Sequence, residues 1–458
     1  MKRTTSAFVT GKRGPLSRNV SVKRALWLVL LCCVCGIDAL GQIQNPWGCQ
    51  NPKNNDLICF VPVATRSIGS QNSPAPAFNS SFATQLSQLP LLSSASGVVL
   101  TLDRTLGVYV LAGESLGPIL TERAQTIGRH RLLLAFAYQH FHFTDIDGTS
   151  LSAAPFVFTY PSGTGGTVYT AQTQNISMSL NQYVALATFG LTTKTDVSVI
   201  LPFGDVSIGS NAAVTLYSVT AAGNPQGNPA SFNNPHLGGS ASGISDMLIN
   251  LKSILWSGEK TKFSGGILFR FPTGDALNYL GSGAYGFNPY AILSYQARLS
   301  PHLRLGYQFN TTTVLLPTKY DAEGNAIAHA GLPGGLQYDF GADYVLFKKV
   351  PTTIAADFLG NFVVNSPVLN LLPYSSQTLG PQLASAYPST ANLKALIAPT
   401  NEVGNPVYNY SYNLAQLSIG AKVKPWRNLV LYGNVLFQLN NVGLRSNPVP
   451  LVGASFTF

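Results

Sequence analysis

The chain has 458 residues, of which 45% are hydrophobic and only 10% are charged. Water-soluble domains carry about 25% charged residues, so the composition argues against an ordinary cytosolic protein. The formal net charge is +10. Residues 1–41 hold seven of the 28 basic residues and one of the 18 acidic ones, which leaves 21 and 17 in the rest of the chain. This small excess gives no reason to predict a nucleic-acid partner.

The N-terminus has the three parts of a secretory signal peptide. Seven basic residues precede an apolar run of twelve residues, 25–36, and Ala39-Leu40-Gly41 provides a small-x-small cleavage site. A run of twelve is too short for a transmembrane helix, which needs about 20 apolar residues. We therefore predict a signal peptide over 1–41 and a mature chain that begins at Gln42, with an uncleaved anchor as the alternative.

Cleavage would remove three of the five cysteines and leave Cys49 and Cys59. An even number of cysteines in an exported chain favours pairing, so we predict a disulfide between them. The alternative, a two-cysteine metal site, lacks a nearby His or further Cys. We expect neither a metal nor a cofactor.

Apolar and polar residues alternate at period two along much of the chain, which is the pattern of β-strands. Leu336, Tyr338 and Phe340 are apolar, for example, whereas Asp339 and Asp343 fall on the other face. We predict twelve strands, over residues 131–143, 175–190, 197–219, 244–256, 261–271, 285–299, 303–310, 336–347, 352–362, 411–423, 429–440 and 449–458.

The connections between these strands alternate in length. The short ones are 192–196, 257–260, 300–302, 348–351 and 424–428, and the long ones are 144–174, 220–243, 272–284, 311–335 and 363–410, with a briefer 441–448. Nothing requires that alternation in a soluble β-sandwich, whereas a transmembrane barrel has short periplasmic turns and long outer loops. We therefore predict an all-β fold, a transmembrane antiparallel up-and-down β-barrel of about 12 strands over 129–458, with 14 strands as the alternative.

The last predicted strand carries a pattern of its own. Val452, Ala454, Phe456 and Phe458 alternate, and Phe458 is the final residue. This pattern is similar to the C-terminal signal of bacterial outer-membrane barrels, which their insertion machinery recognises. The resemblance implies an integral protein of the bacterial outer membrane, with outer-membrane lipid and that machinery as partners.

Residues 42–128 differ from the rest of the chain, because they are rich in Ser, Asn and Pro and show weak periodicity. One patch, 98–111, is a candidate hairpin. The segment could be a periplasmic extension, two extra strands, or a plug in the lumen, and we favour a segment that lies at least partly in the lumen. Because it precedes the first strand, we expect it on the periplasmic side.

Two glycine motifs have stronger structural than chemical interpretations. Residues 113–117 match the nucleophile-elbow pattern G-x-S-x-G, but Pro118 follows at once and no helical period comes next. Residues 281–286 match G-x-G-x-x-G, but they close a long loop before another strand, whereas a dinucleotide site joins a strand to a helix. We interpret both as loops.

Two polar clusters could be taken for metal sites, but each lacks the ligands that such a site needs. His140 and His142 share one face of the first strand, with no third metal ligand at useful spacing. The sequence Asp145-Ile146-Asp147-Gly148 lacks the remaining ligands of a calcium loop, and a plain turn is the favoured interpretation.

Charged residues on the polar faces of the strands form the remaining candidate site. In the predicted registers eight of them point into the barrel: Asp246, Lys252, Arg270, Arg304, Asp339, Asp343, Asp357 and Lys422. An Arg or Lys that faced lipid would cost about 2–4 kcal/mol at the midplane. These residues could line a conduit, or they could form ion pairs that fill and stabilise the interior.

A second resemblance concerns the start of the barrel. The motifs at 115–119 (SLGPI), 121–124 (TERA) and 127–128 (IG) lead into the strand at 138–143 and into Asp147-Gly148. Together with 271–275 (FPTGD), 280–283 (LGSG) and 285–286 (YG), they are similar to barrels of the transporter family of phenol (meta-pathway) degradation. More remotely, the chain resembles fatty-acid and hydrocarbon outer-membrane channels. The resemblance spans about 115–458 and implies passage of small, hydrophobic or aromatic solutes.

We therefore expect a transporter or diffusion channel for small solutes and not an enzyme. A structural or adhesive barrel with ligand-binding outer loops is one alternative. An outer-membrane hydrolase is a second, but it needs a nucleophile paired with a His, and the sequence shows no such pair.

Overall fold

A computed structural model describes residues 49, 55–67, 70, 73–90, 100–103, 108–111, 115–163, 165–320, 326–347, 350–376, 380–397, 410–426 and 428–458. The predicted signal peptide, the predicted mature N-terminus at Gln42, and Gly113 and Glu114 of the G-x-S-x-G motif lie outside these described residues.

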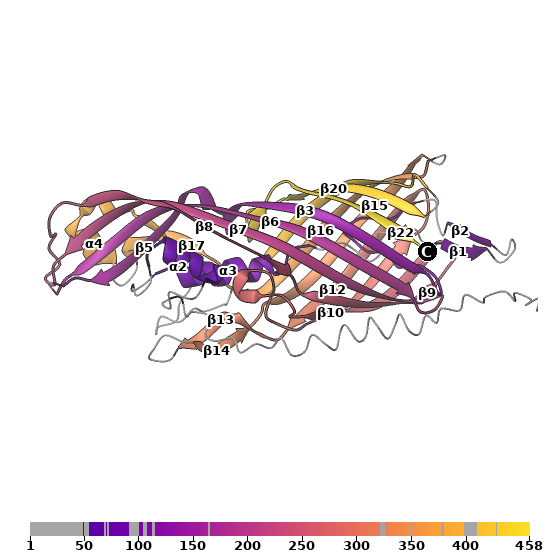
Figure 1. Cartoon of the computed structure of the whole chain (residues 1–458), viewed down its shortest axis with the longest axis horizontal. Coiled ribbons are helices and arrows are strands. Elements are labelled where there is room, and N and C mark those ends of the chain that lie inside the picture. The colour runs from indigo at the N-terminus through magenta and orange to yellow at the C-terminus, as the bar shows by residue number, and fades with distance from the viewer. Residues whose placement is uncertain are drawn as a thin grey trace, which may run out of the picture. The chain divides into compact units, whose positions relative to one another are not determined.

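Twelve antiparallel strands form a closed barrel in the described part of the chain (Figure 1). They are β3 (Leu132–Ile146), β6 (Thr167–Gly190), β7 (Thr195–Val219), β9 (Met247–Ser257), β10 (Thr261–Phe271), β11 (Gly286–Tyr295), β12 (Leu299–Asn310), β15 (Gly334–Phe347), β16 (Thr352–Ser366), β19 (Tyr410–Val423), β20 (Leu429–Gln438) and β22 (Val449–Thr457). Each pairs with the next in chain order, and the ring closes where β3 pairs with both β6 and β22. Closure satisfies the backbone groups of the wall, as the lipid core requires.

The barrel confirms the predicted all-β, up-and-down fold, and each of the twelve predicted strands overlaps one strand of the wall. The alternative of fourteen strands is wrong. Among the described strands, β1 (Leu100–Asp103) and β2 (Val108–Leu111) pair with each other as a hairpin and with no strand of the barrel. The short turns and the C-terminus lie at one end of the barrel, which we call the periplasmic end, and the long connections lie at the other, the outer end.

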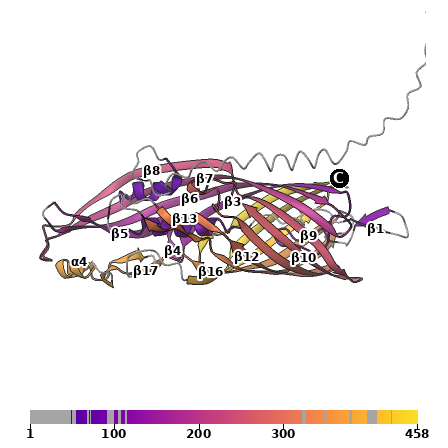
Figure 2. The same ribbon diagram turned by 90° about the horizontal axis from the view of Figure 1, so that it is seen from below.

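Several long connections contain β-structure that was not predicted. β6 and β7 continue beyond the barrel, where they pair with β5 (Ala154–Pro161) and β8 (Ala230–Ile244) (Figure 2). The outer connections also contain β4 (Thr149–Ser150), η3 (Leu151–Ala153), β13 (Thr312–Tyr320), β14 (Ala326–Gly331), β17 (Asn370–Pro373), η5 (Tyr374–Ser376), α4 (Gly380–Ala386), η6 (Pro388–Thr390), β18 (Lys394–Ile397) and β21 (Leu444–Ser446). Nearly all of β8 is at least partly exposed, so neither of its faces required the alternation that identifies a strand.

The wall is apolar outside and polar inside. On β15, Leu336 and Phe340 are 42% and 50% exposed, whereas Asp339 and Asp343 are 8% and 0% exposed. A closed barrel with an apolar outer surface and a polar interior is the fold of an integral outer-membrane protein. Among the described residues, no helix combines the length and the apolar character needed to cross a bilayer.

The N-terminal segment contains helices that the sequence pattern did not predict. The 3₁₀ helix η2 (Leu57–Cys59) leads into α2 (Phe60–Ala64), and α3 (Ala75–Leu86) follows. Ten of the twelve residues of α3 are buried, and five of them are polar, so the helix has no apolar stripe: Asn79, Ser80, Ser81, Thr84 and Gln85. Without such a stripe a helix leaves little periodic signal in the sequence.

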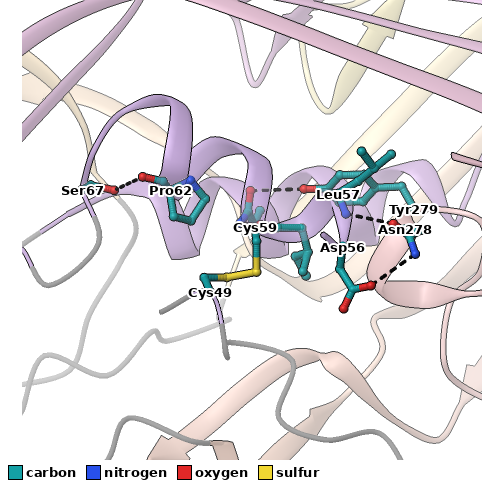
Figure 3. The surroundings of a disulfide bond; sticks show 10 residues. Cys49, Asp56, Leu57, Cys59, Pro62, Ser67, Asn278 and Tyr279 are labelled. Carbon is teal, nitrogen blue, oxygen red and sulfur yellow. Dashed lines mark hydrogen bonds between the residues drawn. A yellow bond between two sulfur atoms is a disulfide. The ribbon is translucent and has the colours of Figure 1, made fainter. Parts of the chain in front are cut away.

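The predicted disulfide joins Cys49 to Cys59 (Figure 3). Next to it, the backbone N–H of Leu57 donates a hydrogen bond to Oδ1 of Asn278, at 2.9 Å, and Nδ2 of Asn278 donates to Oδ1 of Asp56, at 3.4 Å. Asn278 belongs to η4 (Ala276–Asn278), in the outer connection between β10 and β11. The disulfide region is therefore bound to the outer end of the barrel. Residues 56 and 57 thus contact a long connection and not the end of the barrel that carries the short turns, where we expected the segment.

The four residues proposed as the assembly signal lie on the outer face of β22 and at its end. Val452, Phe456 and Phe458 are 56%, 38% and 63% exposed, and Ala454 is partly exposed. The rings of Phe456 and Phe458 lie 4.7 Å apart, and the backbone N–H of Phe458 donates to the carbonyl of Leu132 at 2.8 Å. The terminal ring is therefore exposed on the outer surface of the barrel.

We expect Phe458→Ser to lower the yield of inserted barrel, because it removes the terminal ring of the pattern that resembles the insertion signal. The backbone hydrogen bond to Leu132 stays possible in this variant. The measurement is the amount of heat-modifiable protein in outer-membrane fractions. Leu439→Ser, another exposed apolar residue that lies outside the last strand, is the control. Normal insertion of Phe458→Ser would contradict a role for this residue in assembly.

Candidate solute pathway in the barrel lumen

The eight charged residues predicted to face the lumen all have inward, buried or largely buried side chains. Asp343, Asp357 and Lys422 are at most 1% exposed, Lys252 is 3% exposed, and Asp246 and Asp339 are 8% exposed. The side chains of Arg270 and Arg304 are 11% and 12% exposed. They form two groups, one towards the periplasmic end and one around a central cavity, and segments of the N-terminal region contact both.

Residues 115–127, which we call the inner segment, lie inside the periplasmic half of the barrel. Arg123 binds Asp343 on β15 through both its Nε and Nη2 atoms, and Oγ of Ser115 donates to the same carboxylate. The backbone N–H of Leu116 donates to Oγ1 of Thr353, at 2.9 Å. Side chains from the wall thus hold the inner segment at its start and its middle.

Further wall residues satisfy the backbone of the inner segment. Nζ of Lys252 donates to the carbonyl of Arg123, at 3.1 Å, and lies 3.9 Å from Oε1 of Glu122. The backbone N–H of Ala124 donates to Oγ of Ser294, at 3.0 Å, and that of Ile127 donates to Asp196, at 2.9 Å. Because an extended segment has no internal backbone hydrogen bonds, these inward polar residues provide what a neighbouring strand would otherwise supply.

A buried histidine completes this group. Nε2 of His302 lies 2.7 Å from Oγ1 of Thr121 and 2.9 Å from Oδ1 of Asp357, and Nδ1 lies 3.8 Å from Oδ1 of Asp343. No motif in the sequence indicates this hydroxyl–histidine contact, because the two residues are 181 positions apart. Thr121 and His302 are 1% and 4% exposed and do not line the cavity, so a substrate could not reach them. The contact anchors the inner segment and does not support the hydrolase alternative.

Helix α3 lies in the outer half, among the long connections. Oγ of Ser80 donates to the carbonyl of Leu315, at 2.9 Å, and Oγ of Ser81 donates to the carbonyl of Pro367, at 3.0 Å. Phe82 packs edge-on against Tyr279 of the β10–β11 connection, with ring centroids 5.2 Å apart. Ser80 and Ser81 of α3 are therefore buried against carbonyls of the outer connections, which stabilises a helix that has no apolar stripe.

One carboxylate ties α3 to three outer connections. Asp147, in the turn between β3 and β4, accepts hydrogen bonds from Gln85 and Ser81 of α3 and from the backbone N–H groups of Leu369 and Gly443. Burial raises the pKa of the Asp147 carboxyl, and these donors partly oppose the rise. The turn was predicted as plain, since the partners of Asp147 come from distant parts of the sequence.

A cavity of about 270 Å³ lies between the inner segment and α3. Leu120 and Glu122 of the inner segment line it on one side, and Ala83 and 86–90, from the end of α3 and the residues after it, line it on another. The apolar part of its wall includes Leu180, Ile200, Leu248, Leu268, Leu280, Leu359 and Leu414. The polar part includes Asp246, Asn250, Arg270, Tyr290, Arg304, Gln337, Asp339 and Gln416. The cavity is therefore amphipathic, and both segments of the N-terminal region help to enclose it.

The remaining sequence motifs serve as loops or surface. Residues 281–286 lead from η4 into β11, so this glycine motif joins no strand to a helix. Nδ1 of His140 lies 2.8 Å from Oδ1 of Asn181, and His142 is exposed on the outer face. In the described residues, no group of three or more potential metal ligands gathers.

Residues 159–349 match the model of a family described as "Putative MetA-pathway of phenol degradation". The match agrees with the resemblance found in the sequence, over a shorter span than the expected 115–458. Among solved structures, the chain is similar to an outer-membrane channel from Pseudomonas putida F1, with 11% identity, 73% of this chain and 98% of that chain covered, and a TM-score of 0.42. It is also similar to the NanC porin, with 10% identity, 70% and 98% covered, and a TM-score of 0.31. No curated protein matches the chain.

Proposed function

We propose that this protein is a gated outer-membrane channel that passes small apolar or aromatic solutes through its lumen. The observation that carries the proposal is the amphipathic cavity inside the barrel, enclosed between α3 and the inner segment. A pocket lined mainly by apolar side chains with a few polar groups is the usual form of a small-molecule site. Eight-stranded barrels are filled by side chains and sixteen-stranded ones leave an aqueous channel, so a twelve-stranded lumen with a partial filling suits a narrow, selective path.

In this proposal residues 42–128 act as a plug in two parts. The outer part is α3 with its neighbours, and the inner part is the inner segment. A solute that enters from outside must pass α3, occupy the cavity, and then pass the inner segment. The wall residues Lys252, Asp343, Asp357 and Lys422 belong to the inner barrier, whereas Asp246, Arg270, Arg304 and Asp339 belong to the cavity.

The test is entry of an apolar aromatic dye, such as N-phenyl-1-naphthylamine, into intact Gram-negative cells, whose outer leaflet slows its passage. Expression of the protein should speed the rise in fluorescence. Leu359→Trp, which fills the cavity, should remove most of that gain. Leu293→Trp, on the lipid-facing surface of β11 with 45% exposure, should not. Equal entry with and without the protein would contradict the proposal and favour a structural or adhesive barrel.

A further inference from the structure

The arginines of the cavity decide which solutes it can hold, and this inference rests on the proposed function. From the sequence alone, two inward arginines would indicate a site for an anion, because guanidinium groups bind carboxylates and phosphates well. The structure places both arginines on the cavity wall, so their surroundings determine whether either is available to a solute.

Arg304 is paired with a carboxylate of the wall. Its Nη1 atom donates to Oδ2 of Asp339, at 3.0 Å, and to Oε1 of Gln337, at 3.3 Å. Its guanidinium also lies over the ring of Tyr290, 4.7 Å from the centroid. An anion that approached Arg304 would have to displace or repel the carboxylate of Asp339.

Arg270 is engaged as well. Nη1 donates to the carbonyl of Ser87 and Nη2 donates to Oδ1 of Asn310, at 3.3 and 2.7 Å. Its Nε atom lies 3.9 Å from Oδ2 of Asp246. The backbone N–H groups of Gly274 and Ser282 donate to Asp246 and fix that carboxylate in place. The acidic partner of Arg270 is therefore built into the wall.

The charges around the cavity leave no excess of positive charge. The cavity is lined by three carboxylates, from Glu122, Asp246 and Asp339, and by two guanidinium groups. Lys252, outside the lining, lies 3.9 Å from Glu122 and balances the third carboxylate. A carboxylate solute would lose its water here and find each cation already paired, which is a large cost in a poorly hydrated site.

A solute with a neutral polar group can bind in the cavity at a lower cost than a carboxylate. The side-chain amide of Gln416, which is 9% exposed, lines the cavity and has no hydrogen-bond partner among the described residues. An amide offers both a donor and an acceptor, so it can bind a hydroxyl or a carboxamide. Leu359 and Leu414 line the same cavity and can pack against an apolar body.

We propose that the cavity selects uncharged amphipathic solutes, an apolar ring with one hydroxyl or amide group, over their carboxylate counterparts. Asp339 and Asp246 set this preference because they occupy the two arginines. Gln416 supplies the hydrogen bond to the neutral group. The arginine–aspartate pairs are thus specificity-determining: they deny the cavity to anions that its arginines would otherwise attract.

Benzamide and benzoate test this inference, because they have the same shape and differ in charge. Binding is measured by isothermal titration calorimetry with the full-length protein in detergent, at fixed ionic strength. The wild type should bind benzamide about tenfold or more tightly than benzoate, as expected when one ligand leaves a charge unpaired. Gln416→Leu should weaken benzamide binding several-fold.

Asp339→Asn frees Arg304 without a change of shape, so it should strengthen benzoate binding about tenfold and leave benzamide binding unchanged. Asp246→Asn, which frees Arg270, serves if the first variant does not fold. Asp205→Asn, on the outer surface and bonded to Ser242, is the matched control. Benzoate binding to the wild type as tightly as benzamide, or unchanged preference in both aspartate variants, would overturn the inference. Loss of dye entry in Leu359→Trp would still support the channel in that case, so the two proposals fail separately.

Discussion

Deletion of residues 60–112 is expected to raise the single-channel conductance of the inserted barrel several-fold. The deletion removes α2, α3 and the residues after α3 that line the cavity, and it keeps both Cys49 and Cys59. The inner segment and all twelve strands of the wall remain. With α3 gone, water and ions can fill the outer half of the lumen down to the inner segment. Planar-bilayer recordings of the purified protein measure the change.

A deletion of similar kind provides the control. Residues 375–392 belong to an outer connection that does not line the cavity, and Pro373 and Lys394 at its ends are paired across β17 and β18. A short Gly-Ser turn in their place should leave the conductance unchanged. If the 60–112 deletion also left it unchanged in a correctly inserted barrel, the segment would not be a plug.

Arg123→Met is expected to release the inner segment. Arg123 and Asp343 are 7% and 0% exposed, so the substitution leaves a buried carboxylate without its cation. Removal of one partner from a buried ion pair costs about 3–5 kcal/mol. The strands of the wall are held to one another by backbone hydrogen bonds that do not involve Arg123. The destabilisation should therefore appear first as movement of the inner segment. We expect frequent conductance bursts and cleavage within 115–127 by a protease added to the periplasmic side.

Two further variants separate this effect from a general loss of stability. Arg445→Met breaks a pair with Asp145 whose side chains are 31% and 26% exposed, and such pairs contribute only about 0–1 kcal/mol. It should change neither conductance nor cleavage. In the double variant Arg123→Met, Asp343→Leu, no carboxylate is left unpaired, so much of the closure should return. Bursts of equal frequency in Arg123→Met and Arg445→Met would show that the buried pair does not hold the segment.

The wall could be predicted from the sequence because lipid and lumen act on every strand in the same way. Each strand must present apolar residues outward and can present polar ones inward, so Phe340 and Asp339 reveal their faces without knowledge of their neighbours. The burial of all eight charged residues follows from the same rule. The partners of Asp343 and Lys252 could not be predicted, because Arg123 and Glu122 come from the N-terminal segment.

The segments inside the barrel are harder to predict from the sequence than its wall. Helix α3 is surrounded by loop carbonyls and by aromatic rings, so its Ser and Gln residues are as buried as Phe78 and Phe82. A helix of that kind has no polar face, and its composition resembles a loop. The role of Asp147 was hidden for a related reason: its donors lie 62 to 296 positions away.

The ring of strands surrounds part of its own chain, and this has a consequence for the order of assembly. β3 and β22, the first and last strands of the barrel, are the pair that closes the ring. The inner segment immediately precedes β3, and α3 is bound by Leu315 and Pro367, which come late in the chain. Like the axle of a rotaxane, a molecule in which a ring encircles a rod, the segment is held by a closed loop of backbone. We expect the segment to be in place when β22 meets β3, so that the final pairing seals the barrel around its contents.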